Sequence, residues 1–73
     1  MNKLSIKIQE LCSRKFVNKK IVERFLINID VYDMRQPQAE RCLEIDSKLY
    51  KWDYHTIEAI RAGIDYIYTE IKK

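Results

Sequence analysis

Five isoleucines in the last third of the chain constrain its fold more than any other feature. They follow one another at spacings of 3, 4, 3 and 4 residues: Ile57, Ile60, Ile64, Ile67 and Ile71. A helix that turns about 100° per residue places all five on one stripe. Because an apolar stripe must be buried, the spacing predicts a helix over residues 54–71 that packs against other parts of a protein core.

The opposite side of this predicted helix carries three small residues and one tyrosine: Ala59, Ala62, Gly63 and Tyr66. Small side chains allow a second helix to come close. A glycine inside a helix costs up to about 1 kcal/mol relative to alanine, and close packing is the usual reason to tolerate it. We therefore predict that these four residues form a protein interface.

The length of the chain, 73 residues, predicts one domain that spans residues 1–73. So short a domain buries only ~60% of its unfolded surface, and disulfides, a metal or oligomerisation usually add stability. Two cysteines and one histidine are too few for a disulfide framework or a four-ligand zinc site. The sequence therefore predicts a homo-oligomer or a complex with a larger protein, without metal or cofactor.

The composition is that of a soluble helical protein, because about a third of the residues are charged and glycine and proline occur once each. No apolar run approaches ~18 residues, so we expect no membrane span. The first residues lack the apolar core of a signal peptide. Together with two apparently unpaired thiols, this predicts a cytoplasmic protein.

The pattern of apolar residues predicts an all-α fold, a small bundle of three to four short helices. The first helix spans residues 3–14, and the second begins after Asn18, a good N-cap residue. Pro37 suits the first position of a third helix. Asp53 is a second good cap, so we predict a break before the fourth helix; a continuous third and fourth helix is the alternative.

Each predicted helix has a buried face whose residues lie three or four positions apart. The aromatic residues Tyr50, Trp52 and Tyr54 crowd one helix junction, where they would seal the core or serve as binding hot spots. We favour core packing, above all for Trp52. The buried faces of the first three helices are predicted to contain Leu4, Ile8, Leu11 and Cys12; Ile21, Val22, Phe25, Leu26, Ile29 and Tyr32; and Ala39, Cys42, Leu43, Asp46, Leu49 and Tyr50.

Residues 10–26 resemble a bacterial helix-turn-helix, in which a short helix, a tight turn and a capped recognition helix follow one another. Cys12 takes the place of the small residue where the two helices cross, and Asn18 takes the place of the cap. The chain departs from the motif in the turn, where Phe16 replaces the usual glycine and Lys15 replaces an apolar residue. The resemblance implies that the helix after Asn18 would enter the major groove of DNA.

The charge distribution supports a polyanionic partner, because residues 1–26 hold seven basic and only two acidic side chains. Phosphate neutralisation by such a cluster gives sequence-independent affinity for nucleic acid. A solvated basic face, or a surface for an acidic protein, is the alternative interpretation. The nucleic-acid-binding candidates are Arg14, Lys15, Asn18, Lys19, Lys20 and Arg24.

Nothing in the sequence points to catalysis. Glu40 and Glu44 lie one helical turn apart, but Arg41 and Lys48 are interleaved with them, which favours ion pairing over acid–base chemistry. His55 has no catalytic partner in the local sequence, and one glycine cannot form a phosphate-binding loop. We therefore expect no enzyme activity and no small-molecule substrate.

Two functions fit these observations. The preferred one is a non-enzymatic protein-binding adaptor or inhibitor, of a kind that a phage or another mobile element would encode, that acts by helix-mediated association. The alternative is a small dimeric helix-turn-helix transcriptional regulator. The departures at Lys15 and Phe16 favour the adaptor by a small margin.

Overall fold

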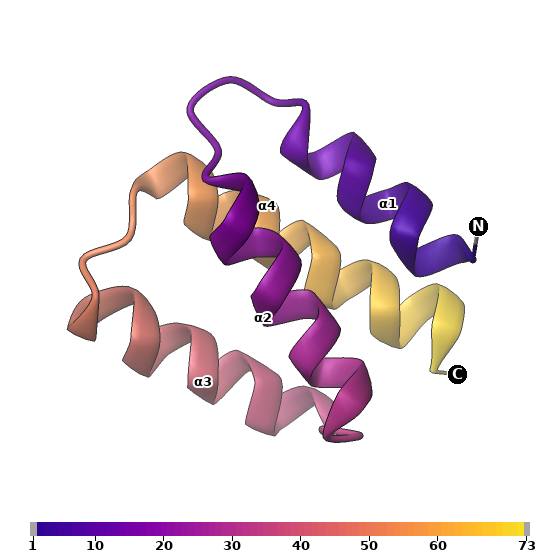
Figure 1. Ribbon diagram of the computed structural model, residues 1–73. Coiled ribbons are helices and arrows are strands. Elements are labelled where there is room, and N and C mark those ends of the chain that lie inside the picture. The colour runs from indigo at the N-terminus through magenta and orange to yellow at the C-terminus, as the bar shows by residue number, and fades with distance from the viewer. Residues whose placement is uncertain (1, 73) are drawn as a thin grey trace.

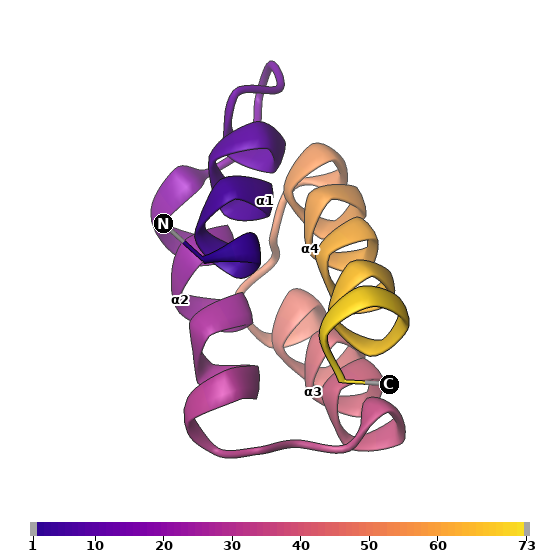
Figure 2. The same cartoon turned by 90° about the vertical axis from the view of Figure 1, so that its right-hand side faces the viewer.

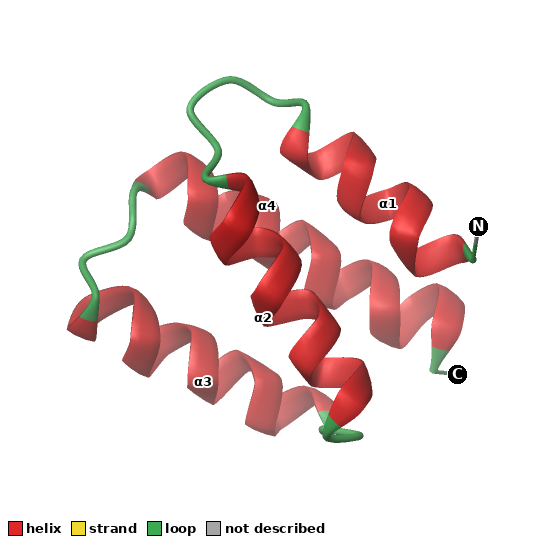
Figure 3. Cartoon of the chain, in the orientation of Figure 1, coloured by secondary structure: helices red, strands yellow, loops and turns green. Residues whose placement is uncertain are grey.

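A computed structural model, which describes residues 2–72, shows that the protein is an all-α bundle. Figures 1 and 3 show its helices joined by short turns, with no strand among the described residues. The predicted fold class is confirmed. The helices are α1 (Lys3–Cys12), α2 (Lys19–Val31), α3 (Gln36–Leu49) and α4 (Tyr54–Tyr66), which a π-helical turn, Ile67–Ile71, extends.

The helix α4 is the centre of the bundle. It packs against α1, α2 and α3, whereas α2 and α3 pack on α4 rather than on each other. α1 and α3 run antiparallel to α4, and α2 crosses in front of it (Figure 1). Figure 2, turned by 90°, shows α1 beside α4. The core that results consists of Ile8, Leu11, Val22, Phe25, Leu26, Ile29, Ala39, Leu43, Ala59, Ile60, Ile64 and Ile67.

Local capping signals set where the helices begin. The Asn18 side chain accepts a hydrogen bond from the backbone N–H of Ile21 at 3.2 Å, and Asp53 accepts one from His55 at 2.9 Å. Each bond satisfies an N–H group that lacks a partner inside the helix. The predicted break before the fourth helix is confirmed. Pro37 lies in the first turn of α3, which starts one residue earlier than expected.

The three turns between helices share an unusual feature: each contains a non-glycine residue with positive φ. These are Phe16 at 64°, Asp33 at 48° and Lys51 at 52°. A side chain in this left-handed region costs about 1–2 kcal/mol. The only glycine of the chain, Gly63, lies inside α4 instead. Helix packing therefore holds the turns in a conformation that their residues do not favour.

The C-terminal end of the bundle is tied to the turn between α2 and α3. The Tyr68 hydroxyl donates to the Met34 carbonyl at 2.5 Å, and the Lys72 ammonium pairs with the Asp33 carboxylate at 2.6 Å. This ion pair lowers the pKa of Asp33 and raises the pKa of Lys72, in both cases chiefly through the hydrogen bond between them. Partial burial raises the pKa of the Tyr68 hydroxyl.

Most residues predicted to be buried lie in or against the core, but Tyr32, Leu49 and Tyr50 are exposed. The prediction fails for them because they stand at the C-terminal ends of α2 and α3, beyond the last buried residue of each helix, Ile29 and Leu43. The first helix is also shorter than predicted, because it ends at Cys12. In residues 2–72, no helix has both the length and the apolar character needed to cross a membrane.

Candidate binding surface at the second helix

The predicted interface on α4 lies largely inside the protein's own core. Ala59 and Gly63 are fully covered, and Ala62 is half-buried against the core. A Cβ atom at Gly63 would lie 2.7 Å from Leu26 Cδ2 and closer still to Cδ1. The close approach at Gly63 is therefore real, but the neighbour is α2 of the same chain. As the fold stands, Ala59 and Gly63 cannot contact a partner protein, and the interface prediction is wrong for these two residues.

Tyr66, the fourth residue of that predicted interface, is half-buried. The Lys7 ammonium of α1 lies 5.2 Å from the centre of its ring, within the range of a cation–π contact. Lys7 also pairs with Glu10 at 2.9 Å. Tyr66 thus contributes to the contact between α1 and α4, with only part of its surface open to solvent.

The turn between α1 and α2 is bound to α4 by a hydrogen bond and contains a residue in the left-handed conformation. The Asn18 backbone N–H donates to the hydroxyl of Thr56, a buried residue of α4, at 2.9 Å. Phe16 has the left-handed backbone conformation that a tight helix-turn-helix turn requires, and its side chain is 76% exposed. Because the ring projects outward, the bulk of phenylalanine does not prevent the turn from forming.

All six nucleic-acid-binding candidates are exposed, and they surround this turn and the first two turns of α2. None of the five basic side chains takes part in an ion pair with another residue of the described range 2–72. Glu23, on the same exposed side of α2, is the single carboxylate within this stretch. The positive charge is therefore free to interact with a partner. The basic residues are Arg14, Lys15, Lys19, Lys20 and Arg24.

Exposed aromatic side chains lie next to the basic cluster. The Phe16 ring is 5.3 Å from the His55 ring, which in turn contacts Tyr54 edge-on at 5.6 Å. The turns that carry these residues meet at one end of the bundle (Figure 1). His55 is exposed and lies in the first turn of α4.

A groove of about 590 Å³ separates α2 from the end of α3. Phe25 lies at its base, with the Trp52 ring edge-on to it at 5.9 Å, and Tyr50 stacks on Trp52 at 6.1 Å. Trp52 is half-buried, so the prediction that it belongs to the core is only partly right. The crowding of aromatic residues at positions 50–54 was the available signal for this groove. The lining residues are Lys20, Ile21, Arg24, Phe25, Asn28, Asp46, Tyr50 and Trp52.

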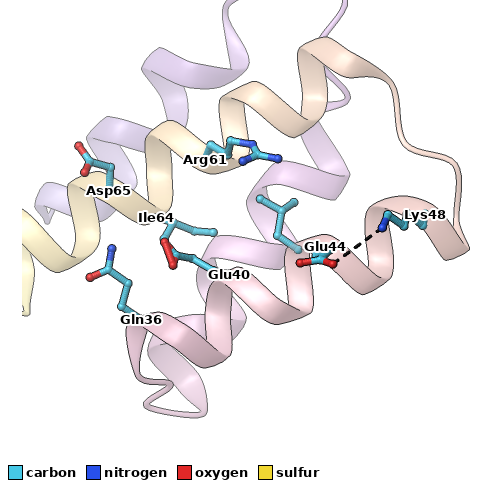
Figure 4. A pocket seen from close by; sticks show the side chains of 8 residues that line it. Gln36, Glu40, Glu44, Lys48, Arg61, Ile64 and Asp65 are labelled. Atoms are coloured by element: carbon cyan, nitrogen blue, oxygen red, sulfur yellow. Dashed lines mark ion pairs between the residues drawn. The ribbon is translucent and has the colours of Figure 1, made fainter.

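A second groove, of about 630 Å³, lies between α3 and α4 and is polar (Figure 4). Glu40 and Glu44 both line it, and Glu44 pairs with Lys48 at 3.8 Å, which agrees with the predicted ion pairing. In residues 2–72, no group of three or more potential ligands is arranged to hold a metal ion.

The two cysteines are free thiols, and each is half-buried. Burial, followed by the nearby Glu23 carboxylate, raises the pKa of Cys12. A raised pKa disfavours the thiolate, which is the reactive form. Cys12 therefore acts as a small packing residue beside α2, where its Sγ lies 3.8 Å from the Lys19 carbonyl.

We compared the chain with models of known protein families, with curated proteins and with solved structures, and none of them matches it.

Proposed function

We propose that this protein is a non-enzymatic DNA-binding module in which α2 enters the major groove of a duplex. The observation that carries the proposal is the geometry of the turn before α2. Phe16 has the left-handed conformation that glycine usually provides in the turn of a helix-turn-helix, and Asn18 caps the helix that follows. The connection of six residues, 13–18, is longer than the usual three or four of the motif. The residue type at Phe16 therefore no longer argues against DNA binding, whereas the departure at Lys15 remains.

The exposed side of α2 fits this role. Val22, Phe25 and Leu26 fix the helix in the core, while Lys20, Glu23 and Arg24 face away from it. No other helix covers α2 in the view of Figure 1. Long basic side chains on such a face are suited to phosphates and to the acceptor atoms of guanine.

Electrostatics supplies the affinity in this proposal. Five unpaired basic side chains stand against one carboxylate, Glu23, around the start of α2. The partial positive charge of the helix N-terminus adds to their field. Each phosphate that a basic residue neutralises contributes about 0.9 to the slope of log K against log salt. The binding should therefore weaken steeply as salt is added.

The test is fluorescence anisotropy with a labelled duplex of ~25 base pairs, followed from low to physiological salt. We expect saturable binding, and we expect Lys19→Glu with Lys20→Glu to reduce the affinity at least about a hundredfold. The matched control is Arg41→Glu with Lys48→Glu, which changes the net charge equally but on α3. If the wild-type protein does not bind the duplex at low salt, or if both double variants lose affinity for it equally, the proposal fails.

A protein-binding adaptor is the second candidate, and the aromatic groove between α2 and α3 is the observation that favours it. Tyrosine and tryptophan are enriched among the residues that dominate binding energies at protein interfaces. The surface differs from the one that the sequence predicted on α4. A partner of this groove would need other chemistry than DNA offers.

A further inference from the structure

The groove between α2 and α3 follows from how these helices are connected. They leave their shared turn in diverging directions (Figure 1), and both pack on α4 rather than on each other. The space between them is therefore widest near the other end of α2, where residues 50–53 join α3 to α4. The aromatic side chains of this connection fill the space only in part.

The base of the groove is apolar and rigid. Phe25 is 8% exposed and is held in the core, and the Trp52 ring meets it at 85°. Tyr50 stacks on the other side of Trp52 at an angle of 21° but is itself 64% exposed. Ile21 adds an aliphatic wall. A bulky apolar side chain placed here would be enclosed by rings that already hold one another in place, which limits the entropy lost on binding.

The rim of the groove is mainly positive. Lys20 and Arg24 line its α2 side, whereas Asp46 is the one acidic residue in the lining. Lys19, one residue before Lys20, extends the positive edge towards the turn. Neither Lys20 nor Arg24 is engaged in an ion pair within the described residues. The complementary partner combines an apolar anchor with negative charge beside it.

We propose that this groove docks an acidic amphipathic helix of a partner protein, with one bulky apolar side chain of that helix against Tyr50 and Trp52. A helix in a groove presents apolar anchors at positions i, i+3, i+4 and i+7, and its flanking carboxylates would meet Lys20 and Arg24. The volume of about 590 Å³ suits one or two such anchors. A phosphodiester backbone has the right charge but no apolar group for the base of the groove. This inference rests on the protein-binding candidate, and the groove shares Lys20 and Arg24 with the proposed DNA surface.

The only tryptophan of the chain, Trp52, makes the test direct. The probes are synthetic helical peptides of ~18 residues without tryptophan, with glutamate on the polar face and leucine, phenylalanine or methionine at the anchor positions. We expect at least one peptide to change the Trp52 fluorescence saturably, with Kd on the order of 1–100 µM. A scrambled peptide of the same composition, and a lysine version of the same pattern, should bind at least about tenfold more weakly.

Matched variants locate the site. Tyr50→Ala should weaken the best peptide about tenfold or more, whereas Tyr54→Ala should leave its affinity unchanged, because Tyr54 is exposed to a similar degree (68%) but lies outside the groove. Arg24→Glu should weaken peptide binding by a comparable factor. Arg41→Glu, on the exposed side of α3, should leave peptide binding unchanged. Circular dichroism of each variant checks that the helices are retained.

Several outcomes would overturn the proposal. One is a panel in which no acidic peptide affects Trp52 up to millimolar concentration, and another is equal binding by Tyr50→Ala and Tyr54→Ala. A Trp52 signal that changes with protein concentration alone would assign the groove to a second copy of the chain. A single-stranded oligonucleotide that saturates the signal with a stronger effect than the peptides would assign it to nucleic acid.

The variant Lys15→Glu separates this proposal from DNA binding. Lys15 belongs to the basic cluster of the turn but does not line the groove. We expect the variant to weaken duplex binding and to leave peptide binding unchanged. Tyr50→Ala should lose peptide binding and keep its duplex affinity, whereas Arg24→Glu should weaken both, because Arg24 belongs to the basic cluster and to the rim of the groove.

Discussion

Gly63 illustrates what a single residue does in this fold. Its missing side chain allows α4 to approach α2 so closely that Leu26 occupies the space of a Cβ atom. The sequence pattern, Ala59 with Gly63 one turn later, correctly indicated close packing. The pattern could not tell which helix comes close, because small residues serve contacts within a chain and between chains equally well.

This contact predicts a change of sign in a double-mutant cycle. Gly63→Ala should lower the free energy of unfolding by ~1–2 kcal/mol, because overpacking against Leu26 outweighs the gain of about 1 kcal/mol in helix propensity. In a Leu26→Ala background, the same substitution should raise it by ~1 kcal/mol, since the space is now free. Urea denaturation followed by circular dichroism measures both. If Gly63→Ala changed the free energy of unfolding in the same direction in both backgrounds, the close contact between Gly63 and Leu26 would be contradicted.

Among the elements, the C-terminal turn after α4 depends most on charge. Lys72 pairs with Asp33, and Tyr68 binds the neighbouring Met34 carbonyl, so the end of the chain holds the turn between α2 and α3. Asp33 has a positive φ, which an aspartate does not favour strongly, and the ion pair holds it in that conformation. The contact closes the bundle at the end opposite to the basic cluster.

The ion pair predicts a bell-shaped pH dependence. Asp33 has a lowered pKa in the folded state, so its contribution to stability is present above its ordinary value of 3.8 and is lost as the pH falls through the lower, folded value. Lys72 has a raised pKa, so its contribution is present below 10.5 and is lost as the pH rises through the higher, folded value. The difference in denaturation midpoint between wild type and Lys72→Met should therefore be largest between these limits.

The control for this experiment is Lys20→Met, which removes an exposed lysine that is not paired within the described residues. Its midpoint should follow that of the wild type across the whole pH range. A difference for Lys72→Met that does not shrink at acid pH would mean that packing of the lysine stem, and not its charge, stabilises the turn.

The capped helix starts were the most predictable part of the structure, because a cap depends on neighbours in sequence. Asn18 and Asp53 cap α2 and α4 as expected, and periodic apolar residues mark most of the core. Exposure at helix ends was not predictable from the pattern. Leu49 and Tyr50 continue the stripe of α3, but whether α4 reaches that far depends on how the helices diverge.

At the scale of the whole molecule, the greatest difference from the sequence prediction concerns α4. The two apolar faces of this helix suggested a shortage of covering surface and hence an oligomer. In the folded chain, α1, α2 and α3 together cover both faces. The apolar residues of α4 therefore do not require another polypeptide, because periodicity shows that a face is buried but not by which segment; association of the chain stays a prediction.

This arrangement predicts the mass of the protein in solution. Light scattering should give the molar mass of one chain from micromolar to near-millimolar concentration, because the apolar stripe and the small-residue face of α4 are already covered. Gly63→Leu should reduce the helix content and the stability instead of dissociating a complex. A mass of two chains that persists on dilution would contradict this expectation.

Of the candidate binding surface, the basic cluster was predictable from the sequence and the groove was not. The basic residues around Asn18 are neighbours in sequence, so their clustering followed from the pattern. The groove combines residues of α2 with Tyr50 and Trp52, about 30 positions later, and such proximity depends on how both helices pack on α4. The aromatic residues at positions 50–54 indicate either core packing or a binding surface, and the sequence alone favours core packing.

The position of α4 as the last helix in chain order has a consequence for biosynthesis. The three segments made first each lack their main packing surface until α4 has left the ribosome. The nascent chain therefore keeps apolar side chains of all three exposed until α4 has emerged, and its core forms only from that point on.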